Sequence, residues 1–425
     1  MKKIKIIFVG IIALLVNHAF AVLEIEITKG ASNAISIAIL PFISETPALG
    51  SEIASIITND LKNSGRFLPV NKAKLISANA SNFVTWREHE VDATVQGKLQ
   101  SISNKLKIDF ELFDVYRQTS LIAKEYQVDP KQLRRLAHHL SDTIYQQLIG
   151  DRGVFSTKVA YVLVERQKNR HPTYKLQLAD SDGYNPQTLV VSNLPLMSPS
   201  WSPDGKKISY VSFEGHRSAI YIQDLATGKR KILTKFPGIN GAPAWSPDGT
   251  KMALVLTKTG YPKIYLLDLA TGRLEQITDG WHLDTEPSWD PDGKSLIFTS
   301  NRGGGPQIYR IQLENKKIQR VTYAGNYNAR GAFLPNGNAI VMLHREGEMF
   351  TIAAQDLRSN KLVLLSPSGN NESPSVAPNG KMILYATNKS GKGVLAAVSI
   401  DGKVHLVLPE INGEVREPAW SPFLK

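Results

Sequence analysis

Short runs of alternating apolar and polar residues recur through the second two thirds of the chain. One unit has such runs at residues 207–212, 219–224 and 230–234, bounded by the turn sequences Pro-Asp-Gly and Thr-Gly. Proline presets φ in a turn and glycine accepts a positive φ, so the chain reverses tightly there. Together with the segment before Pro-Asp-Gly, the pattern predicts four short strands per unit, because these turns leave no room for two helices.

The unit recurs around an anchor residue in motifs such as Pro-Ser-Trp-Ser-Pro-Asp-Gly. Successive anchors lie 44, 44, 44, 43 and 44 residues apart. The anchors are Trp201, Trp245, Trp289, Phe333, Val376 and Trp420. Four strands in about 44 residues are typical of one β-propeller blade. The sequence therefore predicts an all-β six-bladed β-propeller over residues 151–425, with the tryptophan rings packed between blades rather than forming a ligand cage.

The first and last units are incomplete. Residues 161–165, 174–179 and 188–192 resemble the later three strands of a blade, and the terminal Pro-Ala-Trp-Ser-Pro motif at 418–422 resembles a first strand. Joining them would complete the sixth blade and close the ring, which removes exposed sheet edges. Residues 150–155 are the alternative source of that strand.

Residues 34–150 lack the repeat and predict a small α/β domain. Strands are expected at 35–40, 67–70, 92–99, 106–116 and 121–128, and a helix at 49–62. Asp129 and Pro130 are typical of the start of a second helix, which runs to about residue 148 and stops at Gly150. The short connection to the propeller predicts that the two domains pack together.

The first 33 residues predict an export signal followed by a binding segment. Residues 1–21 combine three lysines, an apolar run of 11 residues and an Ala-Phe-Ala cleavage pattern. That run is shorter than the ~20 residues that span a bilayer, and no comparable run follows. The segment 22–33 alternates and predicts a strand that adds to a sheet edge, its own or a partner's, or an ordinary first strand of the domain. Its first residues are Val22, Leu23, Glu24, Ile25, Glu26, Ile27, Thr28 and Lys29.

The amino-acid composition excludes several classes of enzyme and metal site. The chain has no cysteine, which excludes disulfides, thiol enzymes and thiolate metal sites. The formal net charge of +12 becomes +9 without residues 1–21, which carry three lysines and no acidic residue. The basic residues are scattered singly, which favours a solvated surface over a site for nucleic acid, anionic lipid or an acidic partner.

Motifs for catalysis and for metal or cofactor binding are missing. The chain has no G-x-S-x-G nucleophile elbow, no phosphate loop and no H-E-x-x-H helix. His138 and His139 are adjacent on a predicted helix and point about 100° apart, so we expect surface or partly packed histidines rather than a metal site. The sequence Asp180-Ser-Asp-Gly resembles the start of a calcium loop but matches the hairpin turns of neighbouring blades. We therefore expect no catalytic residue, no metal and no cofactor.

A ring of residue pairs is expected immediately before the inner strands, around one mouth of the channel. The pairs are Met197-Ser198, Gly241-Ala242, Thr285-Glu286, Ala329-Arg330, Glu372-Ser373 and Arg416-Glu417. Short loops on a rigid scaffold are common binding sites.

The repeats at 241–249, 285–289 and 372–380 resemble PD40-type propeller repeats. The order of signal, alternating segment, α/β domain and six blades ending in Pro-Ala-Trp-Ser-Pro is similar to the TolB family over essentially the whole chain. The Phe333 motif departs by lacking the preceding proline.

The resemblance implies a periplasmic member of the Tol-Pal system, which links the inner and outer membranes and supports constriction in cell division. It implies that the segment 22–33 binds the inner-membrane protein TolA, with residues 22–29 as its contacts, and that the mouth binds the lipoprotein Pal. The implied Pal contacts are Met197, Ala242, Thr285, Glu286, Arg330, Glu372, Arg416 and Glu417, with Ala242 and Thr285 foremost. Ile239 stands where related sequences often carry a polar residue.

The predicted function is that of a monomeric, non-enzymatic protein-binding scaffold, with other envelope proteins and colicin-like toxins as further candidate partners. A binder of small ligands or glycans in the channel is the alternative, and a hydrolase accessory domain is a weaker one. We further hypothesise that the amino-terminal segment either docks on its own protein or pairs with TolA, and that Pal biases this choice.

Overall fold

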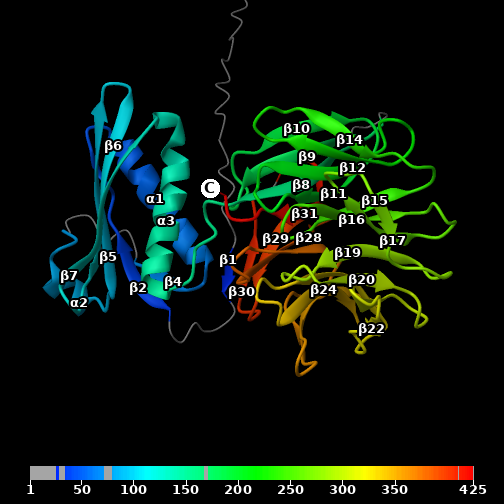
Figure 1. Cartoon of the computed structure of the whole chain (residues 1–425). Helices are drawn as coiled ribbons and strands as arrows, with labels where there is room; N and C mark the ends of the chain where they lie inside the picture. The colour runs from blue at the N-terminus through cyan, green and yellow to red at the C-terminus, as the bar shows by residue number, and fades with distance from the viewer. Residues whose placement is uncertain (1–24, 28–33, 71–78, 167–170, 410, 425) are drawn as a thin grey trace, which may run out of the picture.

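The computed structural model describes residues 25–27, 34–70, 79–166, 171–409 and 411–424. The predicted signal 1–21 and the residues Val22, Leu23, Glu24, Thr28 and Lys29 lie outside this part of the chain. An amino-terminal α/β domain lies beside a larger β-propeller, and its two long helices lie between its own sheet and the propeller (Figure 1). The predicted two-domain fold is confirmed.

Six antiparallel sheets form the propeller. The first blade contains β8 (Lys158–Glu165), β9 (Thr173–Asp180), β10 (Gln187–Ser192) and the last strand, β31 (Glu414–Trp420). The second contains β11 (Leu196–Trp201), β12 (Lys207–Ser212), β13 (Ala219–Asp224) and β14 (Arg230–Thr234). The third contains β15 (Asn240–Trp245), β16 (Lys251–Leu256), β17 (Lys263–Asp268) and β18 (Leu274–Gln276). The fourth blade contains β19 (Asp284–Trp289), β20 (Ser295–Ser300), β21 (Gln307–Gln312) and β22 (Ile318–Arg320). The fifth contains β23 (Tyr327–Phe333), β24 (Ala339–Arg345), β25 (Phe350–Asp356) and β26 (Leu362–Leu364). The sixth contains β27 (Glu372–Val376), β28 (Met382–Lys389), β29 (Lys392–Ser399) and β30 (Val404–Val407).

The last strand of the chain closes the ring. β31 pairs with β8, so that Trp420 lies opposite Val159 and Glu414 opposite Val164. Residues 150–155, the alternative source of this strand, form no strand. The predicted closure is therefore confirmed.

The amino-terminal domain contains a sheet in the order β4-β2-β5-β6-β7, with β3 paired to β5. Its elements are β2 (Ile35–Ile39), β3 (Ile43–Ser44), α1 (Pro47–Asn63), β4 (Phe67–Pro69), α2 (Phe83–Glu88), β5 (Ala93–Ile102), β6 (Lys105–Asp114), β7 (Thr119–Val128), the 3-10 turn η2 (Pro130–Gln132) and α3 (Leu133–Ile149). The Asp129 side chain accepts from the backbone N–H of Lys131, and Gly150 ends α3 at φ 88°. In the part of the chain that the structure describes, no helix is both long and apolar enough to cross a membrane.

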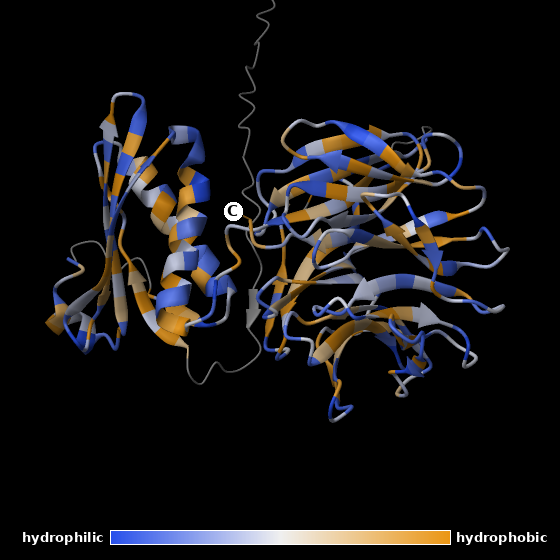
Figure 2. Cartoon of the chain, in the orientation of Figure 1, coloured by the Kyte–Doolittle hydropathy of each residue, from blue (hydrophilic) through white to orange (hydrophobic). Residues whose placement is uncertain are grey.

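Apolar faces hold this domain together. Ile53, Ile57 and Leu61 of α1 and Leu140 and Ile144 of α3 are fully buried in the core beneath the sheet. Apolar residues line the strands of both domains, whereas polar residues are frequent in the turns (Figure 2). Because these two faces are buried against the sheet, only the remaining faces of the two helices can contact the propeller.

The described part of the amino-terminal segment, residues 25–27, pairs with the propeller and not with the α/β domain. β1 (Ile25–Ile27) runs antiparallel to β30, with Glu26 opposite His405, and it lies between the two domains (Figure 1). It is therefore a fifth strand on the blade β27–β30. Of the alternatives left open by the sequence, the structure contains the strand added to an edge of its own protein and not the first strand of the α/β domain.

Candidate functional site

Each of the six inner strands contains a β-bulge at the same place. The bulge puts one residue per blade into the left-handed region, which is unusual for residues other than glycine. These residues are Ser198 (φ 49°), Ala242 (44°), Glu286 (53°), Arg330 (53°), Ser373 (54°) and Glu417 (53°). The expectation that the pairs precede the inner strands is wrong, because the register shifts lie within the strands. Residues in sparsely populated backbone conformations are frequent at functional sites, so this ring of bulges is a candidate site.

The bulges line the central channel. A cavity of about 680 Å³ is bounded by the inner strands of all six blades. It brings together six of the eight predicted mouth residues: Met197, Ala242, Thr285, Glu286, Arg330 and Glu417. Glu372 and Arg416 are not among its lining residues. Arg416 forms an ion pair with Glu414 instead, whereas burial and the charge of Glu417 raise the pKa of Glu372.

Arg330 connects several blades across the mouth. Its Nε lies 2.9 Å from Glu286 Oε1, and one of its terminal nitrogens lies 2.8 Å from Glu417 Oε1. The guanidinium also donates to the Ser373 hydroxyl at 2.5 Å. Burial alone would lower the pKa of Arg330, but the carboxylates of Glu417 and Glu286 raise it above the ordinary value. The guanidinium is therefore a fixed positive charge near the axis.

Glu417 and Glu286 extend this network. Glu417 Oε2 accepts from the backbone N–H of Ser198, and Glu286 Oε2 accepts from the Thr299 hydroxyl. Burial tends to raise the pKa of Glu417, but Arg330 keeps it below the usual range. Five blades contribute a residue to this network, and the remaining blade contributes Ala242. The mouth is thus charged and cross-linked on one side and apolar beside Ala242.

Exposed apolar side chains lie on loops of neighbouring blades at the mouth end of the propeller, and the sequence motifs did not predict them. Because each inner strand starts at the mouth, the loops that enter it and the loops between the second and third strands lie at the same end. These loops carry Tyr261, Trp281, Leu283 and Tyr323, and Trp281 and Tyr323 are each 68% exposed. Trp281 is not one of the repeated blade anchors, and this departure from the repeat is the sequence feature that could have identified it as a surface residue. Together with the rigid rim, these exposed apolar side chains make this end of the propeller a candidate protein interface.

The loop that carries Trp281 is anchored from below. The buried Lys263 donates to the backbone oxygen of His282 and lies 3.3 Å from Asp284 Oδ2. Arg302 binds the other oxygen of Asp284 at 2.9 Å. A buried carboxylate between two cations fixes the loop where it enters β19, so Trp281 is presented from a rigid base.

The anchor tryptophans join neighbouring blades, as predicted. The Nε1–H of Trp201 donates to the backbone oxygen of Ala419 at 3.0 Å, and that of Trp289 to Ala244 at 3.0 Å. Trp245 donates to the Ser209 hydroxyl of the preceding blade. These bonds join each of the three inner strands to the neighbouring blade.

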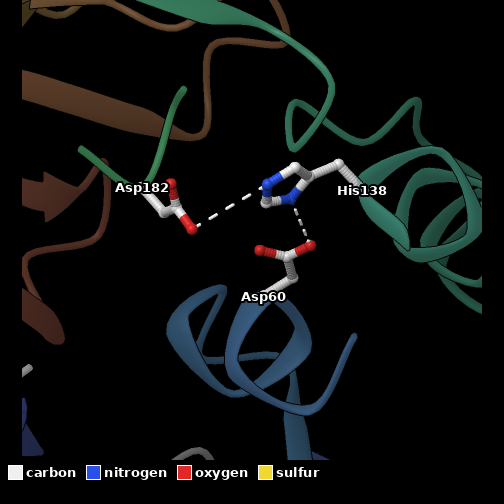
Figure 3. A group of neighbouring side chains, drawn as sticks. All are labelled: Asp60, His138 and Asp182. Carbon is white, nitrogen blue, oxygen red and sulfur yellow. Dashed lines mark hydrogen bonds and ion pairs between the residues drawn. The ribbon is translucent and has the colours of Figure 1, made fainter. Parts of the chain in front are cut away.

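Asp60, His138 and Asp182 form the group of side chains in the described residues that best matches a metal-ligand set, with ligand atoms within 4.8 Å of one another. Figure 3 shows the imidazole between the two carboxylates. Asp60 already occupies Nδ1, and the Arg134 guanidinium contacts Asp182, so the atoms form an ion-pair network rather than an open coordination shell. The expectation of surface or partly packed histidines is wrong for His138, which is 2% exposed, and holds for the exposed His139.

Comparison with known proteins gives a consistent result for both domains. Residues 145–424 match the family model for the TolB beta propeller domain, and residues 23–121 match the model for the TolB amino-terminal domain. The chain is 58% identical to the Tol-Pal system protein TolB of Coxiella burnetii, over 100% of this chain and 99% of that protein. It is 55% identical to the protein of that name in Legionella pneumophila strain Corby, over 98% and 99%.

A solved structure resembles the whole fold. The crystal structure of TolB from Acinetobacter baumannii is 40% identical and superposes with a TM-score of 0.87, covering 94% of this chain and 100% of that one. The similarity therefore includes both domains.

Proposed function

This chain belongs to the TolB family of Tol-Pal system proteins, and from that premise we propose that it is a non-enzymatic periplasmic scaffold that binds the lipoprotein Pal at the propeller mouth. The observation that carries the proposal is the ring of six left-handed bulge residues, which aims one side chain per blade at the channel. A rigid, preformed surface of this kind loses little conformational entropy on binding. The charged network and the apolar rim together suit a folded protein partner with mixed surface chemistry.

The apolar loops favour a protein over a small ligand in the channel. Trp281, Tyr323 and Tyr261 are exposed on the rim rather than inside the cavity. Tryptophan and tyrosine are enriched among residues that contribute most to protein interfaces. A muropeptide or other glycan would instead be expected to contact the inner-strand residues of the channel, and calorimetry with muropeptides tests that alternative.

The amino-terminal segment is proposed to bind TolA by strand exchange. Within the described residues, β1 pairs with the edge strand β30 through Ile25–Ile27, and an extended segment that adds to one sheet edge can also add to a sheet edge of a partner. The segment is then available to add to a sheet edge of TolA. Deletion of residues 22–33 should abolish capture of TolA in a pull-down, and unchanged capture would contradict this assignment.

The Pal assignment is tested by titration calorimetry with purified Pal. Thr285→Arg places a long cation in the mouth and should weaken binding by at least tenfold, which corresponds to ~1.4 kcal/mol. Thr119→Arg is the matched control, because Thr119 is exposed at the start of β7 in the other domain. Equal affinities of the two variants would contradict binding at the mouth.

A further inference from the structure

Three elements from both domains meet around His138. His138 lies on α3, Asp60 lies on α1, and Asp182 lies in the turn between β9 and β10 of the propeller (Figure 3). The Nδ1 of His138 is 2.8 Å from Asp60 Oδ2, and its Nε2 is 3.9 Å from Asp182 Oδ2. The imidazole thus has a carboxylate of its own domain on one side and a carboxylate of the propeller on the other.

The burial of this group follows from the apolar faces of the two helices. His138 occupies the buried face of α3 together with Ala137 and Ser141, and Asp60 occupies the buried face of α1 next to Leu61. The His138 and Asp60 side chains are each 3% exposed, whereas Asp182 is 17% exposed. A polar pair buried at a helix contact needs its full set of partners. His138 Nε2 has no hydrogen-bond partner within the described residues.

Other charges surround the group from each side. Arg134, one turn earlier on α3, contacts both Asp180 and Asp182 of the propeller turn. Lys158 of β8 binds Asp180 at 2.5 Å. Lys381, in the turn between β27 and β28, lines an interdomain cavity of about 70 Å³ together with Asp60 and Asp182. Arg134 and Lys158 are thus directed mainly at Asp180 and Asp182, and Asp60 faces His138.

A proton on His138 changes the interactions across the junction. The imidazolium donates Nδ1–H to Asp60 and directs Nε2–H toward Asp182, whereas neutral imidazole carries a single N–H. Burial alone would lower the pKa of His138, but the charge and hydrogen bond of Asp60 and the charge of Asp182 raise it above the ordinary value. Asp60 belongs to the same domain as His138, so the part of this pKa shift that depends on docking comes from the charge of Asp182 on the propeller.

We propose that His138 is a pH-dependent lock between the two domains: its protonated ring is held between Asp60 and Asp182 when they are docked, and loss of the proton weakens the docking. If docking raises the pKa of a group, protonation of that group stabilises the docked state. This stabilisation is complete at pH values below the ordinary pKa, here ~6.5. The contribution is lost as pH rises through the raised value. Docking should therefore be tightest in mildly acidic solution and loosen in alkaline solution. Each unit by which docking raises the pKa changes the docking equilibrium tenfold.

The experiment uses the full mature chain with spin labels on two introduced cysteines, because the natural sequence has none. Asn104→Cys lies in the exposed hairpin turn between β5 and β6, and Glu314→Cys lies in an exposed propeller turn. Pulsed electron paramagnetic resonance at pH 5.5 and pH 8.5 should give one narrow distance at the lower pH and a broader distribution at the higher pH. An identical distribution at both pH values would overturn the proposal.

Three variants identify the group responsible. His138→Gln and Asp182→Asn should both remove most of the pH response, and His139→Gln, whose ring lies on the exposed side of α3 against Tyr126, should retain it. A response in Asp182→Asn as large as in the natural chain would also overturn the proposal. If His138→Gln does not fold, the imidazole titration of His138, followed by NMR, should move to lower pH in Asp182→Asn. No partner protein is needed, so the result is independent of the proposed binding function.

Discussion

Replacing Arg330 by methionine is a sharp test of the channel network. The substitution keeps an unbranched side chain of similar length but removes the cation that lies 2.9 Å from Glu286 and 2.8 Å from Glu417. Glu286 and Glu417 then lose the cation that joins them. Both keep other donors, since Ser198 N–H still binds Glu417 and Thr299 still binds Glu286.

The expected loss of stability is about 2 kcal/mol at pH 7. Removing one partner of a fully buried ion pair costs ~3–5 kcal/mol, and the 30% exposure of the Arg330 side chain places this case below that range. For a domain of this size, about 2 kcal/mol lowers the midpoint of thermal unfolding by roughly 4 °C. Scanning calorimetry measures the shift, with Arg273→Met in an exposed turn as the control.

The pH dependence distinguishes lost ion pairing from lost packing. The pKa of Glu417 is lowered in the folded chain, chiefly by Arg330 against the opposing effect of burial. Its contribution is therefore present above the ordinary glutamate pKa, ~4.3, and is lost as pH falls through the lowered value. The gap between the natural chain and Arg330→Met should shrink below about pH 4. A gap of the same size at pH 7 and pH 3.5 would refute the electrostatic account.

Two further pairs of variants test packing and binding. Trp289→Ala removes an indole bonded to the neighbouring blade and should lower the free energy of unfolding in urea by ~3–5 kcal/mol. Trp281→Ala should change that free energy by less than ~0.5 kcal/mol but weaken Pal binding at least tenfold. The reverse pattern would contradict the assigned roles. Gly65→Ala should destabilise the domain junction beyond the cost of a left-handed alanine, because at φ 66° its new Cβ would lie 2.1 Å from Val404 Cγ2. Gly228→Ala, at φ 69° with open space around it, should show only that backbone cost of ~1 kcal/mol, and equal losses in the two variants would rule out the clash.

The blades could be predicted because each repeat contains its own turns and its own anchor. The position of Trp420 opposite Val159 followed from the two incomplete units at the ends of the array. The bulges could not be predicted, because residues such as Ala242 and Glu417 carry no composition signal for a positive φ. Only the register of paired strands imposes that conformation.

The contacts between domains were also beyond the sequence. Alternation in residues 25–27 predicts a strand but does not say which of several edges it joins, and the structure pairs it with β30. His138 and Asp60 are 78 positions apart, and their third partner, Asp182, belongs to the other domain. Helical spacing alone placed His138 and His139 on different faces but did not identify which of them is buried.

Hydrogen–deuterium exchange of the full chain with and without Pal tests whether the propeller mouth is a binding surface. Pal should slow exchange in the loops that enter the inner strands, including residues 278–283, and in the bulge segments around Ala242 and Thr285. The turns at the opposite end of the blades, such as residues 226–229 and 270–273, should be unchanged. Protection confined to those turns, or to the amino-terminal domain alone, would contradict a partner-binding mouth.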